Sequence, residues 1–203
     1  MEHVTVKDLV LGSGGALVSG SEETPVSHIR LDSRQVEPGD LFVPLLGERV
    51  DSHRFLPQVM GQGAAAVLTS QEPALPEDGA GCAVIRVEDT KKALQKIGSY
   101  LRDRLTLPLV GVTGSVGKTT TREMIAAALS ARFRVYKTPG NSNSQVGVPV
   151  TLSEITENDQ VGVIELGMSE PGEMEVIAEI AAVDMAVITN VGVTHIENLG
   201  SRE

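Results

Sequence analysis

The chain has 203 residues, 41% of them hydrophobic, which is enough for one large or two small globular domains and excludes a disordered chain. Its formal net charge of −10 argues against a general nucleic-acid binder, because such proteins face phosphates with many Lys and Arg. No apolar run approaches the roughly 20 residues of a membrane span, and the N-terminus lacks a signal-segment pattern. We therefore expect a cytoplasmic protein without membrane insertion.

Short apolar runs in the first half of the chain predict strands separated by turn-rich stretches. These runs cover residues 26–32, 40–46, 64–70 and 82–87. Cys82 is the only cysteine, so no internal disulfide is possible, and its apolar neighbours predict a buried side chain without a role. Asp89 is a plausible N-cap for the helix that follows. The apolar positions of that helix are Leu94, Ile97, Leu101 and Leu105.

A proline marks the expected domain boundary. Pro108 disfavours helix at the residue before it, so the helix should end near 105–108. We therefore predict an α/β protein with a small mixed α/β domain at residues 1–106 and a second domain at 107–203.

Strands and helices alternate in the second domain, which is typical of a parallel sheet with crossover helices. The predicted strands cover residues 107–112, 134–138, 161–166 and 185–190. One helix is expected over 118–130, with its buried side formed by Met124, Ile125, Ala128 and Leu129. Pro171 is expected at the first position of a second helix. Its apolar stripe would be Met174, Ile177, Ala178 and Ala181.

A glycine-rich stretch, GVTGSVGKTTT at residues 111–121, joins the first of these strands to its helix. Such a turn, followed by Lys-Thr at a helix start, cradles nucleotide phosphates because backbone N–H groups and the helix N-terminus converge on the anion. The general pattern G-x-x-x-x-G-K-[ST] needs glycine at position 112, where this chain has Val112. Lys118 nevertheless suits the terminal phosphates, and the Thr119 hydroxyl suits a magnesium ion.

Polar residues follow two further strands of the same predicted sheet, at the edge where open α/β sheets bind ligands. Glu165 closes one strand, and Asn190 and His195 follow another. The carboxylate could bind magnesium or its waters, or could simply end a strand at the surface. His195 could orient a water, contact a carboxylate or cap a turn.

The unusual spacing of the loop has a family counterpart. The form TGxxGKT[ST], matched by residues 113–120, resembles the loop of the Mur ligases, which build the peptide stem of bacterial cell-wall precursors. Similar stretches lie at 32–55, 138–152, 163–174 and 186–203. Two of these motifs, GNxN...GVP and ELGMxxPGE, favour one branch of the family, which adds D-alanyl-D-alanine to UDP-N-acetylmuramoyl tripeptide. The branch that adds a single amino acid stays the alternative.

The resemblance implies an ADP-forming amide ligase that uses ATP and Mg²⁺ and activates a peptide carboxylate as an acyl phosphate. By motif position, the implied phosphate-binding residues are Thr113, Gly114, Ser115, Val116, Gly117, Lys118, Thr119 and Thr120. The implied catalytic residues are Lys118, Glu165 and His195. The implied metal-site residues are Thr119, Glu165 and His195.

The first domain is implied to hold the UDP part of the substrate. The substrate-binding residues implied by the family motifs are Ser33, Arg34, Gly47, Arg49, Asn141 and Asn143. A free Arg34 guanidinium would suit a diphosphate or uracil because its planar fork makes paired hydrogen bonds. Alternatively, the Asp32-Ser33 pair only shapes a turn.

The chain departs from the family pattern at Val116, Ser144 and Ser52, none of which removes a charged group. Since it ends at Glu203, inside the second domain as the family has it, we expect these residues to bind at most the UDP-precursor, and nucleotide only weakly, without ligating. Two other classes stay open. A P-loop switch or kinase would use the same Lys and Thr, although no Asn-Lys-x-Asp motif is present. A non-catalytic UDP-sugar or nucleotide-binding module is the other.

Overall fold

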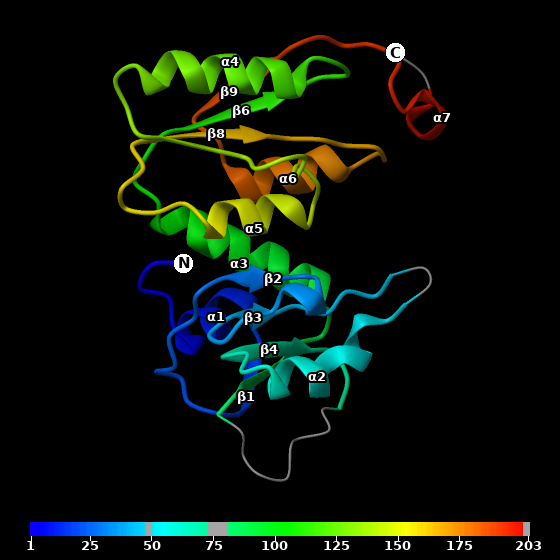
Figure 1. The fold of residues 1–203 in the computed structure, drawn as a ribbon. Helices are drawn as coiled ribbons and strands as arrows, with labels where there is room; N and C mark the ends of the chain where they lie inside the picture. The colour runs from blue at the N-terminus through cyan, green and yellow to red at the C-terminus, as the bar shows by residue number, and fades with distance from the viewer. Residues whose placement is uncertain (48–49, 73–80, 201–203) are drawn as a thin grey trace. The chain divides into compact units, whose positions relative to one another are not determined.

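The computed structural model describes residues 1–47, 50–72 and 81–200 (Figure 1). Contacts within the chain divide it into two units, which we call unit 1 (Met1–Ile97) and unit 2 (Gly98–Glu203). The division falls inside helix α3 (Thr90–Arg104). The boundary predicted at 105–108 stays a prediction. Asp89 lies directly before α3, and its Oδ1 accepts a hydrogen bond from the Lys92 N–H at 2.9 Å, as expected for a cap.

Unit 1 contains a mixed sheet with the strand order β1-β5-β4-β3-β2. Strands β2, β3, β4 and β5 run parallel to one another, whereas β1 runs antiparallel to β5. The strands are β1 (Ala16–Ser19), β2 (Ile29–Arg30), β3 (Leu41–Phe42), β4 (Ala66–Thr69) and β5 (Ala83–Arg86). The four predicted runs each contain one of these strands, but the strands are shorter than the runs. The half-exposed strand β1 was not predicted.

Two aspartates cap the 3-10 helices of unit 1. Asp32 caps the 3-10 helix η1 (Ser33–Gln35), and Asp51 caps the 3-10 helix η2 (Ser52–Phe55). The α-helices are α1 (Val6–Ser13) and α2 (Leu56–Gly61). One core cluster joins Phe42 with Val36, Leu56, Val59, Met60, Ala64, Val67, Cys82 and Val84. Cys82 is buried, as predicted, and this burial raises the pKa of its thiol to about 11.

Unit 2 contains a parallel sheet with the strand order β7-β8-β6-β9, which confirms the predicted mostly parallel sheet. The strands are β6 (Leu109–Thr113), β7 (Val135–Lys137), β8 (Val161–Glu165) and β9 (Met185–Ile188). In Figure 1, α4 (Lys118–Ser130) covers one face, and α5 (Gly147–Ser153) and α6 (Glu173–Ala181) cover the other. The short helix α7 (Ile196–Leu199) follows β9. Within the described ranges, no helix has the length and apolar character needed to span a bilayer.

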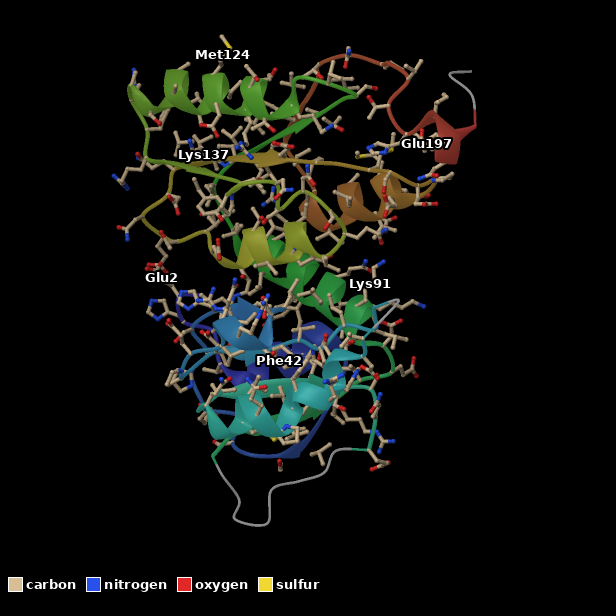
Figure 2. The ribbon with its side chains drawn as sticks, turned by 45° about the vertical axis from the view of Figure 1, so that its right-hand side comes forward. Glu2, Phe42, Lys91, Met124, Lys137 and Glu197 are labelled. Atoms are coloured by element: carbon tan, nitrogen blue, oxygen red, sulfur yellow. The ribbon has the colours of Figure 1, made fainter. Side chains whose placement is uncertain are left out.

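The buried faces of two helices differ from the prediction. Met124 is 69% exposed and points away from the sheet in Figure 2, and Ala128 is also exposed. The fully buried residues of α4 are Arg122 and Ala126. Ile125 and Leu129 are partly buried and pack against Val112, Ala126 and Val163, as predicted.

The second difference concerns α6. Pro171 lies in the turn before this helix, which begins at Glu173 after Gly172 adopts a φ of 81°. Ala178 is exposed, and Ile180 takes its expected place in the core. Of the other predicted residues, Ile177 and Ala181 are buried, and Met174 is partly buried and packs against the same core.

Candidate functional site

The glycine-rich loop occupies residues 114–117, between β6 and α4. Gly117 precedes the first turn of α4 with a φ of 84°, and Gly114 has a φ of 129°. A Cβ atom at position 114 would lie 2.2 Å from the Thr189 Oγ1 atom. Both positions therefore favour glycine, the residue without steric cost at positive φ.

The chain that follows β9 holds this loop in place. The Asn190 carbonyl accepts from the Ser115 N–H at 3.2 Å, and its side-chain Oδ1 accepts from the Val116 N–H at 3.0 Å. The Thr189 hydroxyl donates to the Val116 carbonyl at 2.6 Å. The Ser115 Oγ accepts from the Gly192 N–H at 2.8 Å. These four hydrogen bonds thus tie the loop to the segment after β9.

The start of α4 offers unpaired donors. Within the described residues, no acceptor is hydrogen-bonded to the backbone N–H groups of Gly117, Lys118, Thr119 or Thr120. The Lys118 Nζ atom donates to the Gly114 carbonyl at 2.7 Å, which keeps the ammonium over the loop. Free N–H groups, the positive end of the helix dipole and an ammonium together make a site for a phosphate chain.

Glu165, the last residue of β8, is buried with 1% of its surface exposed. Its Oε2 atom accepts from the Thr119 Oγ1 at 3.0 Å and from the Arg122 Nη1 at 3.1 Å. Its Oε1 atom accepts from the Asn143 Nδ2 at 2.8 Å. Its backbone N–H donates to the Thr138 Oγ1 at 2.9 Å. A buried carboxylate is stable only when paired in this way, so Glu165 is more than a strand-ending surface charge.

Sequence reasoning missed Arg122. Its guanidinium also donates to the Gly140 carbonyl at 2.8 Å and pairs with Glu123 at 2.7 Å. Its position in the sequence could have indicated this role, because Arg122 follows Thr119 by three residues, and residues three apart lie on the same face of a helix.

A cavity of about 460 Å³ adjoins the loop. Its polar lining comes from Thr113, Ser115, Lys118, Asn190, Thr194 and His195. Its apolar lining includes Met168, Met174, Ile188, Val191, Ile196 and Leu199. His195, with a φ of 59°, directly precedes α7, so the structure brings it to the same cavity as Lys118.

The residues around Thr119 fit a magnesium ion in part. The Thr119 hydroxyl and the Glu165 carboxylate supply hard oxygen donors within 3.0 Å of each other, the kind of ligand that would hold a magnesium ion beside a phosphate. In the described part of the chain, no group of three or more His, Cys, Asp or Glu side chains is arranged to hold a metal. Glu165 does not line the cavity that His195 lines, so a joint metal role for these two residues stays a prediction.

The predicted substrate residues of unit 1 are only partly accessible. Ser33 is buried, and Gly47 is exposed, with its N–H donating to the Val50 carbonyl. Arg34 is 85% exposed but not free, because its Nη2 atom pairs with the Asp32 Oδ2 at 2.6 Å. The expectation of an uncommitted guanidinium is therefore wrong. Arg49 lies outside the described residues.

The two candidate asparagines of unit 2 differ in their surroundings. Asn143 contacts Glu165, whereas Asn141 is exposed, and its carbonyl accepts from the Asn143 N–H at 2.8 Å.

The Arg34–Asp32 pair gives a testable pKa. Hydrogen bonds from the Arg34 side chain and backbone lower the pKa of Asp32 to about 2. Since this pKa is depressed, the pair's stabilising effect is present above about pH 4 and is lost as the pH falls toward 2. In Arg34→Ala we expect the pKa of Asp32 to rise toward the ordinary value, and to stop short of it because the backbone N–H still donates. Carboxyl NMR titration measures this shift.

Asp51 serves as the internal control, because hydrogen bonds from the backbone and side chain of His53 lower its pKa independently of Arg34. An Asp32 pKa unchanged in Arg34→Ala would contradict the pairing.

Two protein-family models match the chain. One is described as the Mur ligase family, catalytic domain, and matches residues 25–101; the other, the Mur ligase middle domain, matches residues 112–203. The chain belongs to the Mur ligase family. This membership agrees with the loop spacing at Thr113 to Thr120, and the Mur ligase fold accounts for the mixed sheet followed by a parallel one.

Relatives and solved structures extend the match over nearly the whole chain. The UDP-N-acetylmuramoyl-tripeptide–D-alanyl-D-alanine ligase of Bacillus subtilis is 42% identical over 98% of this chain and 43% of its own length. The crystal structure of MurF from Acinetobacter baumannii matches with a TM-score of 0.89 and 34% identity, over 98% of this chain and 43% of that one. The crystal structure of MurF ligase from Thermotoga maritima in complex with ADP matches with a TM-score of 0.77 and 33% identity, over 88% of this chain and 40% of that one. The chain thus spans less than half the length of these Mur ligases.

Proposed function

We propose that the chain acts within an ATP-dependent, ADP-forming ligase that adds D-alanyl-D-alanine to UDP-N-acetylmuramoyl tripeptide, a cytoplasmic step of peptidoglycan precursor synthesis. The observation that carries the proposal is the 42% identity to the Bacillus subtilis ligase, which runs through both units. The geometry around Lys118 and Glu165 supports it, because the loop is shaped for a phosphate chain.

The chemistry needs activation of a carboxylate, which is a poor electrophile. The peptide carboxylate takes the γ-phosphoryl group of ATP to give an acyl phosphate and ADP. The amine of the dipeptide then attacks the acyl carbon, phosphate leaves and a proton is released. Lys118 and the free N–H groups at the start of α4 would stabilise the negative charge of the transferring group. Magnesium, when bound, would neutralise phosphate charge beside Thr119 and Glu165.

Unit 1 is proposed to hold the UDP-precursor at the carboxyl edge of its parallel strands. Ser33 and Arg34 follow β2 at this edge, and Gly47 lies in the segment after β3. Open α/β sheets bind ligands at this edge. To contact a phosphate, the Arg34 guanidinium must either bind it together with Asp32 or release Asp32.

Calorimetric titration tests the proposal. The 203-residue chain is titrated with the UDP-N-acetylmuramoyl tripeptide and, separately, with Mg-ATP. Lys118→Ala is expected to weaken ATP binding by about tenfold or more, since it removes the ammonium beside the phosphates, and to leave the UDP-precursor unaffected. Arg34→Ala is expected to weaken binding of the UDP-precursor and to leave ATP binding unaffected.

Lys91→Ala, which changes the same residue type on the exposed surface of α3, is the matched control and should leave both affinities unchanged. Binding of ATP alone would remove the support for the substrate assignment. Failure of both ligands to bind would contradict the proposal as a whole.

A further inference from the structure

A row of alternating charges connects β7 to β8 through α4. Lys137 on β7, labelled in Figure 2, pairs with Glu123. Glu123 pairs with Arg122 at 2.7 Å, and Arg122 pairs with Glu165 at 3.1 Å. The row passes from the surface inward, because Lys137 and Glu123 are about half exposed, whereas the Arg122 and Glu165 side chains are 4% and 2% exposed. Its inner pair therefore has almost no contact with water.

One nitrogen of Arg122 joins two parts of the site. Its Nη1 atom donates both to the Glu165 Oε2 and to the carbonyl of Gly140, which lies in the segment between β7 and α5. The same segment supplies Asn143, whose side chain donates to the other carboxylate oxygen and whose carbonyl accepts from the Gly167 N–H at 2.8 Å. The 139–144 segment and Glu165 are thus held against each other, with Arg122 bonded to both.

The oxygen that Arg122 contacts is the one that faces the nucleotide loop. The Oε2 atom of Glu165 accepts from Arg122 and from the Thr119 hydroxyl, which suits a magnesium ion. Because the carboxylate is buried, its hydrogen bonds to Arg122, Thr119 and Asn143 set its rotation, and the rigid guanidinium fork fixes it better than a flexible ammonium would.

We propose that Arg122 is a positioning residue, which orients Glu165 toward Thr119 and couples the 139–144 segment to the metal side of the phosphate site. The inference rests on the proposed function. Arg122 touches neither nucleotide nor metal in this scheme and acts only through Glu165.

The test measures ATP affinity of the 203-residue chain by calorimetry, with and without Mg²⁺, in Arg122→Met and Arg122→Lys. We expect Arg122→Met to reduce the Mg²⁺-dependent gain in affinity by about tenfold or more, while the Mg²⁺-free affinity changes little, because the loop donors stay in place. Arg122→Lys retains the charge but not the planar guanidinium fork, so it should reduce the Mg²⁺-dependent gain in ATP affinity by about threefold.

The matched control is Glu123→Gln, which removes the charge on the outer side of Arg122 and leaves its bonds to Glu165 and Gly140. It should keep the full Mg²⁺-dependent gain. Amide hydrogen exchange supplies a readout without nucleotide or metal. Exchange across residues 139–144 should accelerate in both Arg122 variants and stay unchanged in Glu123→Gln.

A full Mg²⁺-dependent gain in a folded Arg122→Met chain would overturn the inference, as would an equal loss with and without Mg²⁺. If Arg122→Met does not fold, an unchanged gain and unchanged exchange in Arg122→Lys would overturn it equally. A chain without altered residues that binds neither ATP nor the UDP-precursor would refute the proposed function. Acceleration of exchange at 139–144 would still report separately on the coupling through Arg122.

Discussion

Replacing Phe42 with alanine is expected to lower the free energy of unfolding of unit 1 by about 3–5 kcal/mol. Phe42 has no exposed surface and lies within the core of unit 1, as Figure 2 shows, in a cluster with Val67 on the neighbouring strand β4 and Val84 on β5. Truncation removes apolar contacts and leaves a cavity that close-packed strands cannot fill. Urea unfolding followed by circular dichroism measures the change, and amide exchange in β3 and β4 assigns it to unit 1.

Phe133→Ala is the control, because Phe133 is 38% exposed and loses far less contact on truncation. Its cost should stay below about 1 kcal/mol. A Phe42→Ala chain as stable as Phe133→Ala would show that the core of unit 1 is not organised around Phe42.

Replacing Glu165 with leucine is expected to cost about 3–5 kcal/mol of stability in unit 2, because Arg122 is left buried without its inner carboxylate. The Asn143 amide and Thr119 hydroxyl also lose their acceptor. The double variant Glu165→Leu/Arg122→Met should recover much of this loss, since it also removes the buried guanidinium that has lost its inner partner and keeps only Glu123. Denaturant unfolding of the two single variants and the double variant completes the cycle.

The control for this cycle is Glu170→Ala, which removes an exposed carboxylate close to the same strand and should change stability by less than about 0.5 kcal/mol. Additive losses in the double variant would mean that Arg122 and Glu165 do not stabilise each other.

The parallel sheet of unit 2 could be predicted because its central strands β6 and β8 are continuous apolar runs, the pattern of strands buried on both faces. The glycine-rich loop could also be predicted, since Gly117, Lys118 and Thr119 form the site through the local geometry of consecutive residues. Helix α5 was not predicted, because its sequence GVPVTLS combines glycine, proline and β-branched residues that disfavour helix, and packing against α6 and β8 overrides them.

The candidate site was partly hidden for a related reason. Hydrophobic periodicity assigns Arg122 to the surface and Met124 to the core, and the structure reverses both. Asn190 could be placed at a strand end, but its hydrogen bond to Val116 depends on two segments 74 residues apart. Such pairings follow from the register between β6 and β9, which no local pattern encodes.

The state of Cys82 has a practical consequence for studying this molecule. It is the only cysteine of the chain, and its buried thiol, with a pKa of about 11, carries almost no thiolate at neutral pH. A thiol-reactive dye would therefore leave the natural chain unlabelled and would mark a single cysteine introduced at an exposed position such as Ser144. Fluorescence from that one position would follow the segment beside Glu165 as ligands are added, without background from the rest of the protein.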